Sequence, residues 1–396
     1  MRDDWLLLAL GEVATRSTQK NSALLDRVLT VSAEHGLIEQ ELFFTKRVAS
    51  KNLSGYSVVA PGVFVYNKSY SVKAPMGVIA RNRDLQAGVV SPLYIIFQAN
   101  EDKILLEFLE MATNSALFHT SLEGFIKEGG RAHGGITISL GDFFGAALLV
   151  PPLEEQRRIV DVVESVDNYI AALQARVDAA RIARNAVLHE LLNAGGDGWV
   201  QTTLGEVVEV NPKETALPND APFVPMDAVH VGRRYVIYFE KRAERSGARA
   251  RSGDVLFARI TPCLENGKVA QVQEDVGRCG GSTEFIVLRG TEKMTSDLAY
   301  LWATLESTRL SAAGLMTGTT GRQRLSAGDL ASLTLLLPPI AEQRQIVEIV
   351  SSMDDSIQAT QQTIVEAKNL RSGLLSDLLS GEHEIPAVYD KLLGAA

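Results

Sequence analysis

The sequence repeats one of its own strings, and this repetition constrains the fold more strongly than any other feature. Residues 151–160 (PPLEEQRRIV) recur as residues 338–347 (PPIAEQRQIV), an offset of 187 positions (338 − 151). The correspondence continues without a gap beyond these strings. Self-similarity at a fixed offset is typical of a chain built from copies of one structural unit. The sequence therefore predicts a duplicated architecture.

A second repeat opens each half of the chain. Trp5 and residues 10–13 (LGEV) recur as Trp199 and residues 204–207, an offset of 194 positions (199 − 5). A chain of 396 residues is long enough for two domains with separate cores. We therefore predict four segments: a globular domain at 1–150, a central helix at 151–196, a second globular domain at 197–337, and a C-terminal helix and tail at 338–396.

Each diproline string is followed by a regular apolar seam. Apolar residues recur at alternating spacings of four and three, which is the pattern of a coiled coil. Proline suits the helix start because the first amides of a helix have no helical acceptor. We predict that the two helices pair antiparallel; the alternative is that each seam packs on its own globular domain. The predicted seam residues are Ile159, Val163, Val166, Ile170, Val177, Ile346, Val350, Met353, Ile357 and Ile364.

Charged residues also repeat along the two helices. Asp167 corresponds to Asp354, and Arg184 corresponds to Arg371, both at the offset of 187 (354 − 167 and 371 − 184). The arginines occupy seam positions. Polar residues in a coiled-coil seam reduce stability but fix the register of the helices, so we expect these arginines to fix the pairing.

The globular halves contain short β-type runs in place of helical periodicity. Examples are residues 63–66 (VFVY), 94–97 (YIIF), 255–257 (VLF) and 285–288 (FIVL), bounded by turn-forming pairs such as Pro-Gly and Asn-Gly. Apolar helical stretches follow at the same relative place in both halves. The predicted fold class is therefore α+β, with irregular sheets in two globular domains separated by the two long helices.

The net charge of −9 disfavours nucleic-acid binding on average, but the charge is unevenly distributed. Residues 46–83 contain seven lysines and arginines and no acid, and residues 233–268 contain nine against four acids. One such stretch is as easily explained by a solvated surface. A basic stretch in each half favours anion binding.

Several other classes of protein are disfavoured by composition. Two cysteines, Cys263 and Cys279, are too few for a disulfide framework or a four-cysteine zinc site, so we expect reduced thiols and no metal. The longest apolar runs are too short to cross a bilayer, and the acidic start at residues 3–4 does not resemble a secretory signal. We expect a cytoplasmic protein without a membrane partner.

Catalytic motifs are not recognisable in the sequence. It has no Walker motif and no glycine-rich cofactor loop between a strand and a helix, and residues 211–213 (NPK) stop short of the Asn-Pro-Pro-aromatic loop of adenine methyltransferases. Cys263 lacks a recognisable His/Asp constellation. We therefore expect no catalytic residue and no cofactor in this chain, and we interpret its role as binding.

Taken together, these motifs resemble the DNA-specificity subunit (HsdS-like) of type I restriction–modification systems, over essentially the whole chain. The resemblance rests on the two LGEV openers, on residues 51–56 (KNLSGY) and 282–285 (STEF), and above all on the duplicated diproline string. It implies two target-recognition domains, each reading half of a split double-stranded DNA target. It also implies that the helices set the gap and dock two methyltransferase subunits, which carry S-adenosylmethionine, and that a restriction (motor-nuclease) subunit joins for phage defence.

Candidate DNA-contacting residues come from the basic stretches and from the polar loops ahead of each diproline helix. Arginine and lysine pair with guanine, and asparagine and glutamine pair with adenine, while phosphate contacts set the register. The alternative for each residue is a solvent-facing side chain. The candidates are Lys46, Arg47, Lys51, Arg131, His133, Arg259, Lys268, Arg322, Gln323 and Arg324.

Three other interpretations stay open at this point. The chain could be a specificity-like subunit of another phage-defence or modification system, with a different enzyme partner. It could itself methylate or cut DNA, which the missing cofactor and phosphate loops disfavour. It could also be a coiled-coil scaffold that binds no nucleic acid, which would leave the two basic stretches unexplained.

Overall fold

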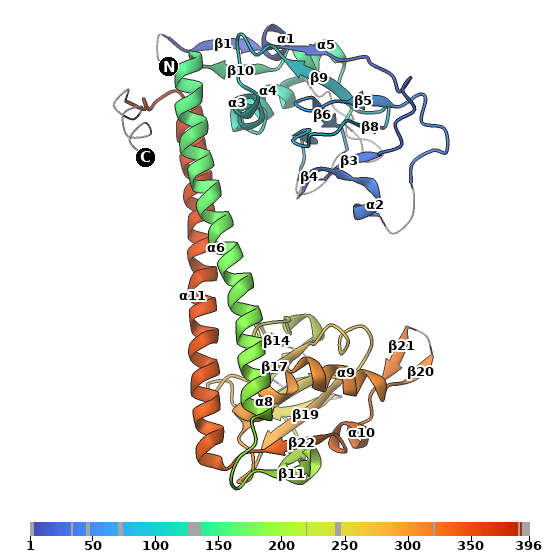
Figure 1. Cartoon of the computed structure of the whole chain (residues 1–396), viewed down its shortest axis with the longest axis vertical. Helices are drawn as coiled ribbons and strands as arrows, with labels where there is room; N and C mark the ends of the chain where they lie inside the picture. Colours follow the sequence, from blue (N-terminus) through green and yellow to red (C-terminus); the bar gives the residue numbers. More distant parts are fainter. Residues whose placement is uncertain are drawn as a thin grey trace. The chain divides into compact units, whose positions relative to one another are not determined.

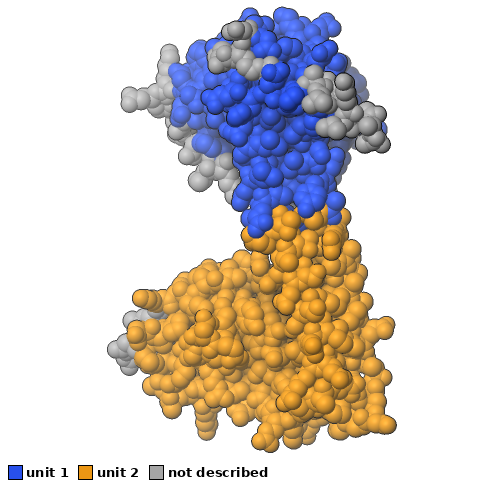
Figure 2. Space-filling model, turned by 90° about the vertical axis from the view of Figure 1, so that its left-hand side faces the viewer, with its two compact units in different colours: residues 1–172, 364–396 blue, residues 173–363 orange. Residues whose placement is uncertain are grey.

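The computed structural model describes residues 4–32, 35–44, 48–69, 74–125, 136–218, 220–241, 247–319, 321–386 and 389. The chain divides into two compact units, coloured separately in Figure 2. Unit 1 consists of Met1–Ala172 and Ile364–Ala396, and unit 2 consists of Leu173–Thr363. The boundary falls inside both long helices, so each unit contains one globular domain and a stretch of each helix.

Unit 1 has a four-stranded antiparallel sheet in the order β2-β9-β6-β7 and three two-stranded sheets, β1-β10, β3-β4 and β5-β8. Its strands are β1 (Leu6–Ala9), β2 (Ala14–Arg16), β3 (Leu29–Ser32), β4 (Gly36–Glu39), β5 (Ser57–Val59), β6 (Phe64–Asn67), β7 (Val78–Arg81), β8 (Gly88–Val90), β9 (Ile95–Ala99) and β10 (Ala147–Val150). Its short helices are α1 (Leu10–Val13), α2 (Gln40–Phe43), α3 (Leu106–Ala112), α4 (Ala116–Phe125) and α5 (Leu140–Phe144).

Unit 2 has two four-stranded sheets, β12-β19-β16-β17 and β14-β13-β18-β15, and two two-stranded sheets, β11-β22 and β20-β21. Its strands are β11 (Val200–Thr203), β12 (Val208–Val210), β13 (Pro222–Val224), β14 (Glu240–Lys241), β15 (Ala248–Arg251), β16 (Val255–Ala258), β17 (Val269–Gln271), β18 (Arg278–Gly281), β19 (Phe285–Gly290), β20 (Thr317–Thr319), β21 (Arg322–Arg324) and β22 (Thr334–Leu337). Its short helices are α7 (Leu204–Val207), η2 (Met226–Ala228), α8 (Ser296–Ala303), α9 (Glu306–Gly314) and α10 (Ala327–Ala331).

The two units repeat the same plan. In each, the opening strand pairs antiparallel with the strand ahead of the diproline, β1 with β10 and β11 with β22. In each, the next strand lies at the edge of a four-stranded sheet with matching order, β2-β9-β6-β7 and β12-β19-β16-β17. The predicted α+β class with irregular sheets is confirmed.

The LGEV string of each half forms a one-turn helix, α1 or α7, directly after the opening strand. The glutamate reaches back to the amide ahead of the helix: Glu12 Oε2 accepts from the Ala9 N–H at 2.7 Å, and Glu206 Oε2 accepts from the Thr203 N–H at 3.1 Å. The glycine permits close packing, since a Cβ at Gly205 would lie 3.0 Å from the Ala331 Cβ of α10. The repeated string is therefore a tight corner of the scaffold.

Each long helix begins with a buried glutamine that joins it to its globular domain. The Gln343 amide donates to the carbonyls of Lys293 and Pro338 at 2.7 and 2.9 Å, and its oxygen accepts from the Thr295 N–H at 3.1 Å. Gln156 makes the same three bonds in unit 1, to Lys103, Pro151 and Leu105, at 3.0, 2.8 and 2.8 Å. Both side chains are fully buried. The glutamine of the diproline string thus satisfies backbone groups that water cannot reach.

The residue before each glutamine anchors the opening segment of the domain. The indole N–H of Trp5 donates to Glu155 at 3.1 Å, and that of Trp199 donates to Glu342 at 2.8 Å. The two repeats seen in the sequence therefore contact each other in both units, and together they fix where each helix leaves its domain.

The long helices α6 (Leu153–Asn193) and α11 (Ile340–Leu379) pair antiparallel within each unit (Figure 1). In unit 1, Arg371 Nη2 donates to Asp167 Oδ2 at 2.8 Å. In unit 2, Arg184 donates to both oxygens of Asp354 at 2.9 Å. Asp167 corresponds to Asp354, and Arg184 corresponds to Arg371. The same ion pair therefore forms in both units, with the aspartate on α6 in unit 1 and on α11 in unit 2. The predicted antiparallel coiled coil is confirmed.

The seam is continuous with the globular cores. Most of the predicted seam residues are buried, and Val166, Ile170 and Met353 are partly buried. In unit 1, Ile159 and Val163 belong to a core that includes the stacked rings of Tyr66 and Phe143, 4.7 Å apart, and also Leu378 and Leu379 of α11. In unit 2, Ile346 and Val350 share a core with Leu188 and Leu192 of α6. The seam residues thus do both of the things considered for them: the helices pair with each other, and the ends of the paired helices also pack on the globular domains. The buried seam residues are Ile159, Val163, Val177, Ile346, Val350, Ile357 and Ile364.

Removing one partner of the interhelical ion pair should destabilise unit 2 more than unit 1. Arg184 is 8% exposed, so Asp354→Ala leaves a charge with little access to water, and we expect a loss of about 2–4 kcal/mol of unfolding free energy. The matched variant Asp167→Ala should cost about 1 kcal/mol or less, because the Arg371 and Asp167 side chains are 31% and 43% exposed. Urea unfolding followed by far-ultraviolet circular dichroism measures both. Equal losses would contradict this difference in burial.

Gln343→Leu should detach the start of α11 from its domain. The variant leaves the Thr295 N–H and two carbonyls without their buried partner, and we expect a loss of about 2–3 kcal/mol. Hydrogen exchange of the Thr295 amide should accelerate accordingly. Gln156→Leu should have the equivalent effect on Leu105 and none on Thr295; an unchanged exchange rate in both variants would show that the glutamines are dispensable.

Candidate nucleic-acid interface

Strands β20 and β21 form a hairpin that carries three of the predicted contact residues. Thr317 is opposite Arg324, Gly318 is opposite Gln323, and Thr319 is opposite Arg322. Figure 1 shows this hairpin at the edge of unit 2. Gly318 has φ of +132°, and a Cβ there would lie 2.9 Å from the Arg322 carbonyl oxygen. The close approach of the two strands therefore requires glycine.

The other edge of β21 is joined to the segment that contains Arg259. The Leu325 N–H donates to the Arg259 carbonyl at 2.8 Å, and the Thr261 N–H donates to the Gln323 carbonyl at 3.1 Å. The Thr261 hydroxyl accepts from the Gln323 N–H at 3.1 Å. The fold thus brings Arg259 beside the hairpin and holds the backbone of β21 from both sides.

Side chains alternate along β21. Arg322 and Arg324 are exposed, whereas Gln323 between them is partly buried. Since alternate residues of a strand point to the same face, both arginines lie on one face of the hairpin. A two-stranded ribbon of this kind has the width that the major groove of DNA admits.

Arg324 is held by a carboxylate from a neighbouring turn. Its Nε lies 3.1 and 3.0 Å from Glu284 Oε1 and Oε2, and its Nη2 lies 2.7 Å from Oε1. Hydrogen bonding to Glu284 raises the pKa of Arg324 above its ordinary value. Glu284 is itself fixed, because its N–H donates to the Ser282 hydroxyl at 3.3 Å and its carbonyl accepts from the Arg259 N–H at 2.9 Å.

The remaining described candidates differ in their accessibility. Arg259 is partly buried, and its Nε is buried without a hydrogen-bond partner among the described residues. Lys268 is also partly buried and donates to the Met226 carbonyl at 3.0 Å. Lys51 is exposed ahead of β5. These positions leave Arg322, Arg324 and Lys51 as the most accessible of the candidates that the structure describes.

Four candidates lie outside the described residues: Lys46, Arg47, Arg131 and His133. The described chain resumes at Ile136, whose N–H donates to the Lys68 carbonyl at 2.7 Å. Ser139 and Ser326 then cap α5 and α10 in the same way, accepting from the amides of Asp142 and Asp329. With these serines aligned, Thr137 occupies the place of Arg324 (324 − 187).

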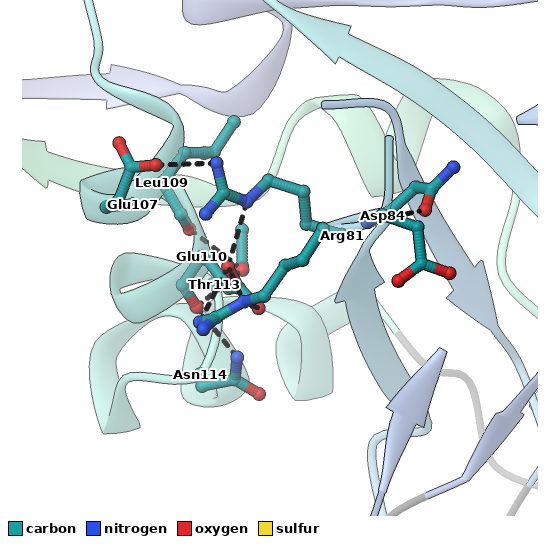
Figure 3. Close-up of polar contacts among 9 residues, drawn as sticks. Arg81, Asp84, Glu107, Leu109, Glu110, Thr113 and Asn114 are labelled. Carbon is teal, nitrogen blue, oxygen red and sulfur yellow. Dashed lines mark hydrogen bonds and ion pairs between the residues drawn. The ribbon is translucent and has the colours of Figure 1, made fainter. Parts of the chain in front are cut away.

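The basic stretch of the first half is partly neutralised within unit 1, so fewer of its cations are free to bind anions than the sequence indicates. Arg81 on β7 bonds Glu107 at 2.6 Å and Glu110 at 3.1 Å on α3 (Figure 3). Arg83 also contacts Glu110, at 3.1 Å. Burial acts to raise the pKa of Glu107, but hydrogen bonds from its backbone and from Arg81 outweigh burial and lower it. These two arginines join sheet to helix.

Arginines of unit 2 are used in the same way. Arg234 lies over the ring of Tyr300, pairs with Asp297, and donates to Gln271 at 2.9 Å and to Ser351 of α11 at 3.1 Å. A second arginine, Arg289, holds the buried Asp254 at 2.8 and 2.7 Å and Glu214 at 2.7 Å. Hydrogen bonds to these acids raise the pKa of Arg289. Counting basic residues along the sequence therefore overstates the free positive charge.

Metal and thiol chemistry find no support in the described part of the chain. It contains no group of three or more histidine, cysteine, aspartate or glutamate side chains that could hold a metal ion. Cys263 and Cys279 are unbonded, and burial raises the pKa of Cys279 to about 12, which keeps that thiol protonated. Nor does any described helix combine the length and apolar character needed to cross a membrane.

Comparison with known proteins assigns the second half of the chain. Residues 196–369, which include the hairpin, match the family described as type I restriction modification DNA specificity domain. The EcoAI specificity subunit of Escherichia coli is 26% identical over 200 residues, 47% of this chain and 34% of that protein. The EcoKI specificity subunit of Escherichia coli K12 is 22% identical over 362 residues, 77% and 73% of the two chains.

The fold is shared over the full length with solved structures. One, from a type I restriction–modification system studied for its assembly and conformational transition, has a TM-score of 0.61 at 20% identity and covers 97% of this chain and 99% of that one. The S subunit from M. genitalium has a TM-score of 0.51 at 11% identity and covers 96% and 97%. The chain therefore shares its fold with these structures. Its matches nevertheless span 34% and 28% of the EcoAI and EcoEI specificity subunits.

Sequence reasoning missed the residues that support the site. Glu284 stands in the quoted string 282–285 but was not selected, because its partner Arg324 is 40 positions away. Gln156 and Gln343 belong to the repeated diproline string, but the sequence did not indicate which groups they bond. Repetition in both halves was the signal for the glutamines, and only the register of the strands reveals the Glu284–Arg324 pair.

Arg81→Met should show that Arg81 supports the fold and does not contact DNA. Loss of the bonds to Glu107 and Glu110 should lower stability by about 1–3 kcal/mol while DNA affinity at moderate salt stays within about twofold. The control Lys51→Met removes one exposed charge from the same stretch and should leave the melting temperature unchanged. Thermal melting and fluorescence anisotropy give the two readouts, and a fall in DNA affinity for folded Arg81→Met would contradict the structural role.

Proposed function

We propose that this chain is the DNA-recognition subunit of a type I restriction–modification complex and has no catalytic role of its own. Each globular domain would read one half of a split double-stranded DNA target. The observation that carries the proposal is the hairpin β20–β21, whose two exposed arginines lie inside the residues that match a DNA specificity domain.

The two long helices would set the gap between the half-sites and dock the partners. They are 41 and 40 residues long, and their ion pairs repeat with the helices exchanged. An internal duplication of this kind suits two copies of one partner. We propose that two methyltransferase subunits bind here and bring S-adenosylmethionine and the adenine chemistry, and that a restriction subunit joins for cleavage. We propose that the complex acts in the cytoplasm, where its DNA target would lie.

The acidic net charge is consistent with phosphate contacts and base contacts being made by different subunits. A chain with a net charge of −9 that also uses Arg81, Arg234 and Arg289 internally has little cation to spare for phosphates. Phosphate contacts supply most of the affinity for DNA, whereas contacts to base edges supply the specificity. We propose that partner subunits provide many of the contacts to DNA phosphates and that this chain provides the base contacts.

The decisive experiment is methylation mapping with a co-expressed partner. The chain produced with the methyltransferase encoded beside it should methylate adenines in a split motif with a constant internal gap, which single-molecule sequencing detects. Replacing residues 197–337 by the corresponding domain of another specificity subunit should change one half of the motif and leave the other half unchanged; replacing residues 1–150 should do the converse.

Other outcomes discriminate the alternatives. A purified complex that produces no new methylation would assign the chain to another defence or modification system. Binding of S-adenosylmethionine by the purified chain alone would revive a catalytic role. A complex that binds no DNA would favour a scaffold.

A further inference from the structure

We propose that Glu284 is a positioning residue that holds Arg324 so that Arg324 reads a guanine in the half-site of the second domain. The inference rests on the proposed function and adds to it the base and the residue pair. Neither residue forms part of the seam or of the helix anchors.

The geometry of the pair leaves one edge of the guanidinium for a base. A guanidinium presents two donor edges, one formed by Nε and Nη2 and the other by Nη1 and Nη2. Glu284 occupies the first edge through contacts of 3.1, 3.0 and 2.7 Å. Within the described chain, Nη1 has no recorded hydrogen bond, and the Arg324 side chain is 45% exposed. The remaining edge matches the O6 and N7 acceptors of guanine in the major groove.

Both members of the pair start from fixed backbone. Arg324 belongs to β21, which is bonded to β20 on one edge and to residues 259–261 on the other. Glu284 is fixed by Ser282 and by the Arg259 N–H, and β19 begins at the next residue. An arginine already ordered in its reading position loses less conformational freedom on binding, so more of its hydrogen-bond energy appears as discrimination.

The presence of Glu284 beside Arg324 is better explained if Arg324 contacts a base than if it contacts a phosphate. An arginine that only grips phosphate gains nothing from a neighbouring carboxylate, because the negative charge of Glu284 would repel the phosphate. The acceptors of guanine are uncharged and are not repelled by Glu284. By fixing the free donor edge of Arg324, the carboxylate lets that edge discriminate among bases. Adenine presents an N6 donor where guanine has O6, so a fixed arginine edge would meet an unfavourable donor.

The first domain retains the scaffold but changes the reading pair. Thr137 stands at the place of Arg324 and is exposed. Leu93 occupies the place of Glu284, because its N–H donates to the Ser91 hydroxyl at 3.3 Å as the Glu284 N–H donates to Ser282 at 3.3 Å. The same two positions therefore carry a charged pair in one domain and uncharged groups in the other, as expected of positions that read different bases.

The test measures base preference position by position. The chain is assembled with its methyltransferase, and competition binding is measured on its mapped target and on every single-base change in the second half-site. We expect guanine to be required at one position. Arg324→Lys, which keeps the charge but loses the fork, should reduce discrimination at that position roughly 5–100-fold, the equivalent of about 1–3 kcal/mol, and should leave affinity for unrelated DNA nearly unchanged.

Glu284→Gln should weaken discrimination several-fold at the same position and nowhere else, while affinity for unrelated DNA stays equal or increases because a negative charge has been removed. Arg309→Ala serves as the control: Arg309 is an arginine of unit 2 paired with Glu306 at 3.0 Å, and its loss should leave the whole profile unchanged. Melting temperatures confirm that each variant is folded.

Several results would overturn the assignment. If Arg324→Lys and Glu284→Gln leave the profile intact, the pair reads no base. An equal loss at all positions in Glu284→Gln would make Glu284 merely structural, and an equal loss on target and unrelated DNA in Arg324→Ala would make Arg324 a phosphate contact. A wild-type complex with no sequence preference would overturn the proposed function as well, whereas a clear split target with unaffected variants would overturn only the guanine contact.

Discussion

A helix of about forty residues with an apolar seam cannot remain folded alone in water, and this constraint organises the chain. The duplication supplies a second helix of the same kind, and antiparallel pairing buries both seams within each unit. Asp167 and Arg184 stand at positions where the reversed copy presents Arg371 and Asp354. One sequence pattern, duplicated, therefore supplies both members of each ion pair, and the register follows without any further element.

The residues that repeat in both halves support the fold, whereas the residues proposed to recognise DNA do not repeat. Gln156 and Gln343 make identical bonds, and so do the tryptophan–glutamate contacts that join each domain to its helix. At the hairpin, by contrast, Arg324 has only Thr137 as its counterpart. Buried polar groups must be satisfied in the same way in every copy of a fold, whereas exposed side chains on a fixed strand can change without disturbing the fold.

The sequence was sufficient where the signal is periodic or repeated. Seam spacing predicted the helices, and their pairing was predicted because neither helix could bury its apolar seam alone. It was insufficient where partners depend on strand register: Arg81 meets Glu107 only because β7 lies against α3. Charge counting overstated the free positive charge for the same reason, since a guanidinium paired across 26 residues looks identical in the sequence to a free one. Glu284 escaped notice because only the hairpin brings Arg324 to it.

The distribution of charge also bears on how specificity and affinity are separated. A recognition surface with abundant free cations binds any DNA tightly, and its base contacts then contribute a small fraction of the total. Here arginines such as Arg81, Arg234 and Arg289 are committed to internal acids, and Arg324 is partly neutralised by Glu284. Non-specific attraction of DNA by the chain itself is thereby reduced, so under the proposed function the few ordered contacts of the hairpin would carry a larger share of the choice between sequences. Under the proposed assembly, phosphate affinity supplied by other subunits would then be added equally to every site and would leave that choice unchanged.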